Sequence, residues 1–242
     1  MEASAAESSN SNFRKGLQSG LSIAIGYFPI ALTFGLLSKT TGLSFYETVL
    51  MSLVVFAGAS QYMSLSLLAA GTNPILIVLT TFIVNIRHLL MSASLNAKVE
   101  DEKIWKKAVY AFGITDETFS VMATKDQTVS TGFAFGVILI SYLSWVVNSG
   151  IGFIIGAALP KVLQEGMTVA LYAMFIGLLV PSMKKSFKVV FLAGLAAFFN
   201  SFFFFYKILG TGWAIIISTI LSAVIVEVVE TMKRKRGLEA NE

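Results

Sequence analysis

Long stretches without a charged side chain constrain this chain more than any other feature. Asp, Glu, Lys and Arg are absent from residues 16–38, 48–86, 127–160, 166–183, 189–206 and 208–226. A helix that spans a membrane needs about 20 predominantly apolar residues. Only 13% of the residues are charged, against roughly 25% in a soluble domain. The sequence therefore predicts an all-α, polytopic integral membrane helical bundle.

The uncharged stretches and the turn residues between them predict eight helical segments. These lie at about 17–38, 46–70, 74–95, 104–124, 131–159, 167–182, 186–206 and 210–232. The segment 104–124 carries two carboxylates in its middle, so seven crossings plus one buried or re-entrant segment is an alternative. The run 127–160 fits one long tilted helix or two short ones. The count is therefore seven or eight transmembrane helices.

A shift of 124 residues aligns Gly42-Leu43-Ser44 with Gly166-Met167-Thr168, which suggests a weak internal three-helix repeat. The flanks differ from the apolar part of the chain. Residues 1–12 are small and polar and are expected to form a disordered tail, followed by a single transmembrane domain over 13–232 and a basic cytoplasmic tail over 233–242.

The net charge of +4 comes largely from short basic clusters. The cluster Lys233 to Arg236 follows a predicted helix and is typical of a cytoplasmic anchor on anionic lipid, not of a nucleic-acid site. If all eight segments cross, this cluster, residues 184–188 and Arg14-Lys15 share one side, and both termini are cytoplasmic. The loop 98–107, with four lysines, would then lie on the opposite side, against the positive-inside rule.

The residue types needed for several kinds of soluble chemistry are missing. The chain has no cysteine and one histidine, so neither a disulfide nor a metal site is expected. Nucleotide-binding and zinc-protease motifs are absent as well. We therefore expect no cofactor, no nucleic acid and no enzyme activity, and energy supplied by an ion gradient or by a partner.

Polar groups inside the apolar segments are the candidate functional residues, because burying them in hydrocarbon is costly. In the first segment Pro29 frees a backbone carbonyl one turn earlier. In the second, small residues around Gly58 allow a break or a close backbone approach, and Gln61 needs hydrogen-bond partners. The alternative for both is helix packing. Asn148 lies on a similar inward-facing stripe of the fifth segment.

The third segment is the most polar of them. Asn85 and His88 lie on one helical face, and Arg87 points about 100° away from His88. His88 is a candidate proton relay, or a histidine satisfied within a packed bundle. Arg87 is the strong candidate cation in the interior, so we expect it to pair with Asp116, which leaves Glu117 nearer the surface.

An intramembrane serine hydrolase is an alternative function. Gly58-Ala59-Ser60 is similar to the start of the Gly-x-Ser-Gly motif of rhomboid proteases, with His88 as the base. However, Gln61 stands where that motif has its second glycine. A third reading is a membrane scaffold that stabilises a partner subunit without transporting anything.

Several motifs together resemble the AzlC family, the large subunits of bacterial branched-chain amino acid exporters. These motifs are Pro29-Ile30-Ala31 with Phe34-Gly35, the stretch 56–61, the stretch 85–90 followed by Ser94-Leu95, and the stretch 115–119. The resemblance covers about residues 13–230.

The resemblance implies a multi-pass protein of the bacterial inner membrane that exports valine, leucine and isoleucine, with methionine as a further candidate. It also implies a small membrane subunit of the AzlD type and coupling to the proton gradient. A zwitterionic substrate needs a carboxylate site, for which Arg87 or the broken helices near Pro29 and Gly58 are candidates. Asp116, Asn85 and Gln61 are candidates for its ammonium group.

Overall fold

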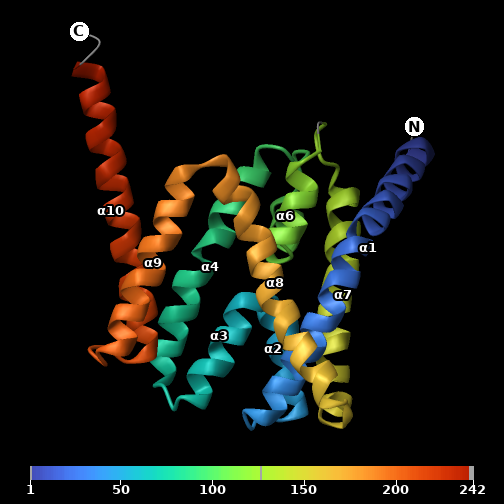
Figure 1. Cartoon of the computed structure of the whole chain (residues 1–242). Helices are drawn as coiled ribbons and strands as arrows, with labels where there is room; N and C mark the ends of the chain where they lie inside the picture. Colours follow the sequence, from blue (N-terminus) through green and yellow to red (C-terminus); the bar gives the residue numbers. More distant parts are fainter. Residues whose placement is uncertain (1, 126, 240–242) are drawn as a thin grey trace. The chain divides into compact units, whose positions relative to one another are not determined.

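Helices make up the regular structure of this protein (Figure 1). The computed structural model describes residues 2–125 and 127–239. The helices are α1 (Glu2–Thr40), α2 (Phe45–Val55), α3 (Gly58–Ala69), α4 (Pro74–Asn96), α5 (Ile104–Phe112), α6 (Asp116–Ala123), α7 (Thr131–Ile155), the 3-10 turn η1 (Gly156–Ala158), α8 (Lys161–Lys185), α9 (Phe187–Phe205) and α10 (Thr211–Glu239). The described residues contain no β-strand, and the predicted helical class is confirmed.

Five helices of the described chain are long and apolar enough to cross a membrane. They are Ser11–Thr40 of α1, α4, α7, α9 and Gly212–Lys233 of α10. Two of the eight predicted segments are wrong as single helices, because 46–70 and 104–124 each consist of two shorter helices. These five candidates do not confirm the predicted total of seven or eight crossings.

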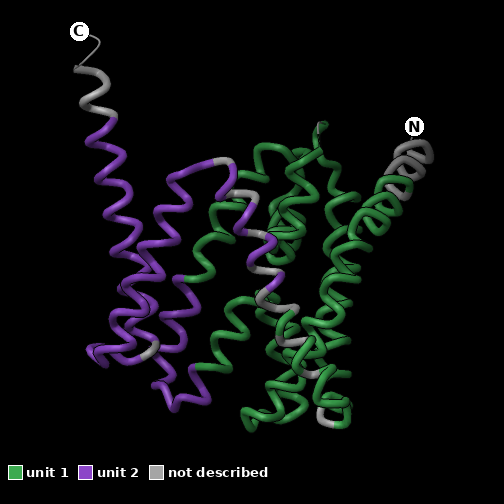
Figure 2. Tube along the Cα trace, in the orientation of Figure 1, with its two compact units in different colours: residues 1–66, 84–172 green, residues 67–83, 173–242 purple. Residues whose placement is uncertain are grey.

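The chain divides into two compact units (Figure 2). Unit 1 comprises residues 1–66 and 84–172, and unit 2 comprises residues 67–83 and 173–242. The sequence predicts a single domain over 13–232. At the ends, α1 already begins at Glu2 and α10 continues to Glu239, so helix extends into both predicted tails. Residues 240–242 of the predicted tail lie outside the described residues.

Unit 1 is built on α1 and α7, which run side by side (Figure 1). Gly16 meets the backbone of α7 at Gly136, and Gly35 meets it at Gly152, so residue numbers increase in the same direction along both helices. The helices are therefore parallel. A Cβ at Gly152 would overlap the backbone of Leu32, so glycine is required here for the close approach.

The helices α2 and α3 form a re-entrant pair and do not cross unit 1 as one segment. A capping box between Ser44 and Glu47 starts α2, and Phe56 ends it in the left-handed conformation, with φ 41° and ψ 47°. The Gln61 amide then donates to the Ser52 hydroxyl over 3.2 Å. Nine residues of continuous helix would separate these two by about 13 Å, so the chain reverses at Phe56-Ala57.

The helices α5 and α6 also double back. Gly113 ends α5 and Thr115 caps α6, with a reciprocal capping box to Thr118. The end of α6 returns to the loop that precedes α5, where the Lys98 ammonium donates to the carbonyl of Ala123. Both predicted segments, 104–124 and 46–70, therefore fold back on themselves.

Because α2 and α3 double back, the lysine-rich loop 98–107 no longer conflicts with the positive-inside rule. The loop 98–107 pairs with the residues just before α7, and the Lys125 ammonium lies 3.8 Å from the centre of the Phe133 ring. Because α1 and α7 are parallel, Arg14 and Lys15 lie at this same end of unit 1. The expectation that the loop faces the opposite side from Arg14 was wrong, because α2–α3 is not a crossing. The positive-inside rule predicts that this end faces the cytoplasm.

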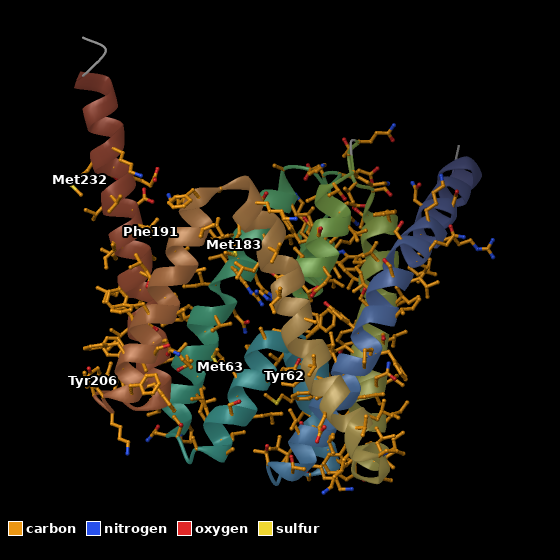
Figure 3. The ribbon with its side chains drawn as sticks, viewed as in Figure 1. Tyr62, Met63, Met183, Phe191, Tyr206 and Met232 are labelled. Atoms are coloured by element: carbon orange, nitrogen blue, oxygen red, sulfur yellow. The ribbon has the colours of Figure 1, made fainter. Side chains whose placement is uncertain are left out.

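Unit 2 contains α9 and α10, which pack together and are joined by an ion pair from Lys188 to Glu227 over 3.1 Å. Its outer surface is rich in exposed apolar side chains, among them Phe191, Tyr206 and Met232 (Figure 3). The suggested repeat is not supported in its register. It aligns Gly42, in a turn with φ 94°, with Gly166, which lies inside α8.

Candidate functional site

Two re-entrant turns meet in the middle of unit 1, on the framework of α1 and α7. We call residues 55–61 the first tip and residues 112–118 the second tip. The rings of Phe56 and Phe112, one from each tip, lie 6.5 Å apart, and both pack against Tyr142 of α7. The breaks leave the first backbone amides of α3 and α6 without intrahelical partners, so each tip needs other hydrogen-bonding groups.

Gln61 fastens the first tip. Its side-chain oxygen accepts from the Trp145 indole over 3.0 Å and from the Ala57 amide over 3.3 Å. Its amide group donates to Ser52, whose hydroxyl donates to Ser149 of α7. The side chain is fully buried. Because these contacts occupy its oxygen and one amide proton, Gln61 is placed to hold the break closed and not to face a ligand.

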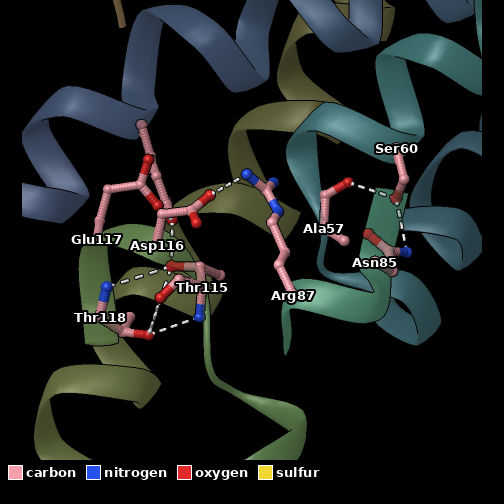
Figure 4. Close-up of polar contacts among 9 residues, drawn as sticks. Ala57, Ser60, Asn85, Arg87, Thr115, Asp116, Glu117 and Thr118 are labelled. Carbon is pink, nitrogen blue, oxygen red and sulfur yellow. Dashed lines mark hydrogen bonds and ion pairs between the residues drawn. The ribbon is translucent and has the colours of Figure 1, made fainter. Parts of the chain in front are cut away.

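Asn85 of α4 reaches the same tip through Ser60. The Ser60 hydroxyl donates to the carbonyl of Ala57 over 2.9 Å, so its oxygen must accept from the Asn85 amide group at 3.0 Å (Figure 4). This fixes the orientation of the Asn85 amide. Its Oδ1 atom is buried and has no hydrogen-bond partner among the described residues. An acceptor is therefore available at this position.

Arg87 pairs with Asp116 at the second tip, as the sequence predicts (Figure 4). The Nη1 and Oδ2 atoms are 2.7 Å apart, and the two side chains are 37% and 25% exposed. The pair is thus neither fully dry nor fully solvated. The Arg87 Nε atom is buried and has no partner in the described part of the chain. A donor is therefore available on Arg87, as an acceptor is on Asn85 two residues earlier on α4.

Glu117, which the sequence predicts to lie nearer the surface, is partly buried and has a partner of its own. Its Oε2 atom accepts from the Tyr27 hydroxyl over 2.6 Å, and Tyr27 is buried on α1. The same hydroxyl lies 2.7 Å from Oγ1 of Thr115, the residue that caps α6. Asp116 and Glu117 diverge on the first turn of α6 as expected, but each has found a partner: Arg87 on α4 and Tyr27 on α1.

The remaining predicted site residues are not joined to this cluster by hydrogen bonds. The carbonyl of Pro29 accepts from Thr33 of the same helix, and the Asn148 amide donates back to Ser144 on α7. His88 is half-buried on α4 and has no hydrogen-bond partner among the described residues. Gly58 begins α3, where a Cβ would come within 2.8 Å of the Trp145 ring, so its role is to allow close packing.

Tyr27 is the residue that sequence reasoning missed. It contacts both tips: its ring packs edge-on against Phe56 at 6.4 Å, and its hydroxyl bonds to Glu117 and Thr115. A buried tyrosine normally finds a partner for its hydroxyl. This rule singles out Tyr27 within an uncharged helix, although the sequence alone does not indicate which partner it finds.

The arrangement does not assemble the hydrolase expected under the alternative reading. Ser60 bonds to Ala57 and Asn85, and in the described residues no hydrogen bond joins it to His88. The described residues also contain no cluster of three or more metal-ligating side chains. The cluster instead contains an ion pair, together with a donor on Arg87 and an acceptor on Asn85 that have no partner among the described residues.

Comparison with known proteins identifies the relatives of this chain. A family profile described as "AzlC protein" matches residues 22–159, more than half of the chain. The chain belongs to the AzlC family. The matched part of this AzlC protein runs from α1 through α7 and so includes both tips and every residue of the cluster.

Individual relatives are membrane proteins from bacteria and archaea. An uncharacterized membrane protein of Archaeoglobus fulgidus is 35% identical over 184 residues, which are 73% of this chain and 78% of the relative. The inner membrane protein YgaZ of Escherichia coli is 31% identical, over 73% and 75%. The branched-chain amino acid transport protein AzlC of Bacillus subtilis is 30% identical, over 73% and 70%. No solved structure matches this chain. With its apolar helices, these relatives establish it as a multi-pass membrane protein.

Proposed function

We propose that this AzlC protein is the large subunit of a secondary transporter that exports branched-chain amino acids across the cell's inner membrane. Valine, leucine and isoleucine are the proposed substrates, with methionine as a further candidate. The observation that carries the proposal is the Arg87–Asp116 pair, together with the Arg87 Nε and Asn85 Oδ1 atoms of the same helix, which have no partner among the described residues. The name of the Bacillus subtilis relative supports the choice of substrate class.

A zwitterionic amino acid complements this cluster. Its carboxylate can accept from the Arg87 guanidinium, which presents several donors in a fixed plane. Its ammonium can donate to Asp116 and to the Asn85 oxygen. Each charge of the substrate then replaces one partner of the existing ion pair, so no group is left unpaired when the pair opens.

An apolar side chain of the substrate needs an apolar surface near these charges. Phe112 at the second tip is 45% exposed and packs beside Phe56 and Tyr142. We assign these aromatic rings to the substrate side chain. Gln61 and Gly58 act in this proposal by holding the first tip in position, and Pro29 and Asn148 by packing.

Coupling to the proton gradient requires a group that can take up a proton near the substrate. His88 and Glu117 occupy the two helices that carry Arg87 and Asp116, and we propose them for this role. A small membrane subunit of the AzlD type completes the exporter in this proposal. The exposed apolar surfaces of the bundle otherwise face lipid.

Export of radiolabelled valine from preloaded cells tests the proposal. Cells that produce this chain with an AzlD-type subunit should lose valine faster than cells without the chain. Asp116→Asn and Arg87→Lys should each reduce the export rate, expressed as Vmax/KM, by roughly 10–100-fold. Asp116→Asn removes the counter-charge of the substrate ammonium, and Arg87→Lys keeps the charge but loses the planar set of donors for the carboxylate. Asp101→Asn is the matched control, since Asp101 lies in an exposed loop, and it should keep the wild-type rate.

Two results would contradict the proposal in different ways. Valine loss that is equally fast with and without the chain would exclude the transporter. Valine loss that needs the chain but survives both Asp116→Asn and Arg87→Lys would instead favour the scaffold, with transport carried out by the partner.

A further inference from the structure

Tyr27 of α1 contacts both tips. Its ring lies edge-on to Phe56 of the first tip and, at 5.2 Å, to Trp145, which holds Gln61. Its hydroxyl bonds to Glu117 and Thr115 of the second tip. The residue is 4% exposed, so these contacts are made within packed surroundings.

The hydrogen bonds around the hydroxyl have a fixed direction. The Glu117 carboxylate can only accept, so the Tyr27 proton is donated to it. The Tyr27 oxygen can then accept from Thr115, whose own oxygen accepts from the Thr118 amide. The hydroxyl therefore holds both the N-cap and the second residue of α6, on either side of Asp116 in the sequence.

We infer that Tyr27 is a positioning residue that couples the two re-entrant tips. A displacement of Asp116 is passed to the first tip through the hydroxyl, the ring and Phe56. The purpose of this coupling rests on the proposed transport function. When a substrate opens the Arg87–Asp116 pair, the first tip would move as well. The coupling itself is a property of the contacts and can be measured without any substrate.

The natural absence of cysteine makes the measurement direct. Ala57→Cys places a single thiol at the first tip, where Ala57 is 3% exposed, and its reaction with N-ethylmaleimide reports access to that tip. Asp116→Asn serves as the disturbance at the second tip. With Tyr27 present, Asp116→Asn should change the rate of thiol modification by roughly threefold or more, as expected for residues coupled through shared contacts.

The same disturbance should have a much smaller effect on the thiol once the link through Tyr27 is cut. In the Tyr27→Phe background, which keeps the ring and removes the hydroxyl, Asp116→Asn should change the modification rate much less, because only the ring contacts among Phe56, Phe112 and Tyr142 still join the tips. Tyr142→Phe is the matched control, because the Tyr142 hydroxyl bonds to Leu53 beside the first tip and to no residue of the second. The response to Asp116→Asn should survive in that background.

A second pair of variants keeps the test decisive if Tyr27→Phe does not fold. Glu117→Leu removes the acceptor of the same hydrogen bond and should make the response much smaller, whereas Glu117→Gln keeps an acceptor and should retain it. Equal responses to Asp116→Asn with and without the link would overturn the inference. So would the absence of any response in the protein that retains Tyr27.

Transport measurements then separate this inference from the proposed function. In the export assay Tyr27→Phe should lower Vmax roughly tenfold and leave the KM for valine nearly unchanged, because the binding groups remain in place while the joint movement is lost. Changes in KM alone would count against coupling. A wild-type protein that exports no valine would refute the proposed function, while the thiol result would still decide whether Tyr27 couples the tips.

Discussion

The two tips are held to the other helices by different chemistry. At the first tip, neutral groups hold the chain: Gln61, Ser52, Ser149 and Trp145 bond to one another in a fully buried network. At the second tip, the contacts to the other helices run through two carboxylates, from Asp116 to Arg87 and from Glu117 to Tyr27. Both tips rest on the same parallel pair of helices.

This difference indicates a division of roles. In a buried network of neutral groups that are already hydrogen-bonded, an exchange of partners brings no gain in free energy, so the network favours a single rigid arrangement. Charged contacts that are partly exposed can be replaced by the charges of a ligand, since water and substrate both reach them. We therefore expect substitutions at the first tip to change mainly stability, and substitutions at the second to change mainly transport.

The largest effect should come from the framework that carries both tips. Gly152→Ala would drive a Cβ into the backbone of Leu32 and force α1 and α7 apart, at a cost of about 3 kcal/mol in the free energy of unfolding. Thermal unfolding in detergent measures the loss, and export should fall with it. Gly26→Ala is the control, because no atom lies within 4 Å of its Cβ position, and its stability should not decrease.

Gln61→Leu should distinguish the roles of the two tips most clearly. It leaves the Trp145 indole and the Ala57 amide without their acceptor, which we expect to destabilise the protein by about 2 kcal/mol. Asp116→Asn, measured in parallel, should shift the unfolding temperature much less while it reduces export more strongly. If the two variants lost stability equally, the proposed division of roles would be wrong.

Ser60→Ala should have a smaller effect. The Ser60 hydroxyl only links Ala57 to Asn85, so its loss should cost about 0.6 kcal/mol and reduce valine export no more than about threefold. The measurement also tests the hydrolase alternative. A serine nucleophile could not be replaced by alanine without loss of activity, so near-normal export in Ser60→Ala would argue against it.

The smallest effect should be found at the exposed pair of Asp101 and Lys107. The hydrogen bond from the Lys107 ammonium, 2.8 Å long, is the main cause that lowers the pKa of Asp101. A lowered pKa contributes stability that is present above the ordinary pKa of the carboxyl group and is lost as the pH falls through the lowered value. At neutral pH the pair is intact. Because it is exposed, Asp101→Asn should leave the unfolding curve at pH 7 unchanged within error.

The sequence correctly predicts the helical membrane class and the pairing of Arg87 with Asp116. A single strong cation and a carboxylate, each inside an apolar segment, leave few ways to satisfy both charges. The sequence wrongly treats 46–70 and 104–124 as continuous helices. Apolar periodicity is the same in one long helix and in two short ones that fold back, so periodicity does not reveal the reversal. The small residues around Gly58 and the two carboxylates in 104–124 only indicate that a break is an alternative.

The reversals depend on contacts between distant parts of the chain. Phe56 adopts a left-handed conformation although it is not a glycine. The turn is held by the contact of Gln61 with Trp145, 84 residues away, and of Ser52 with Ser149, 97 residues away. Glu117 finds Tyr27 across ninety residues in the same way. The sequence by itself determined which groups must be buried in a membrane, because hydrocarbon excludes unpaired charge. For Gln61 and Glu117, only the tertiary structure decided which group each meets, because a hydrogen bond requires both partners to be brought within about 3 Å.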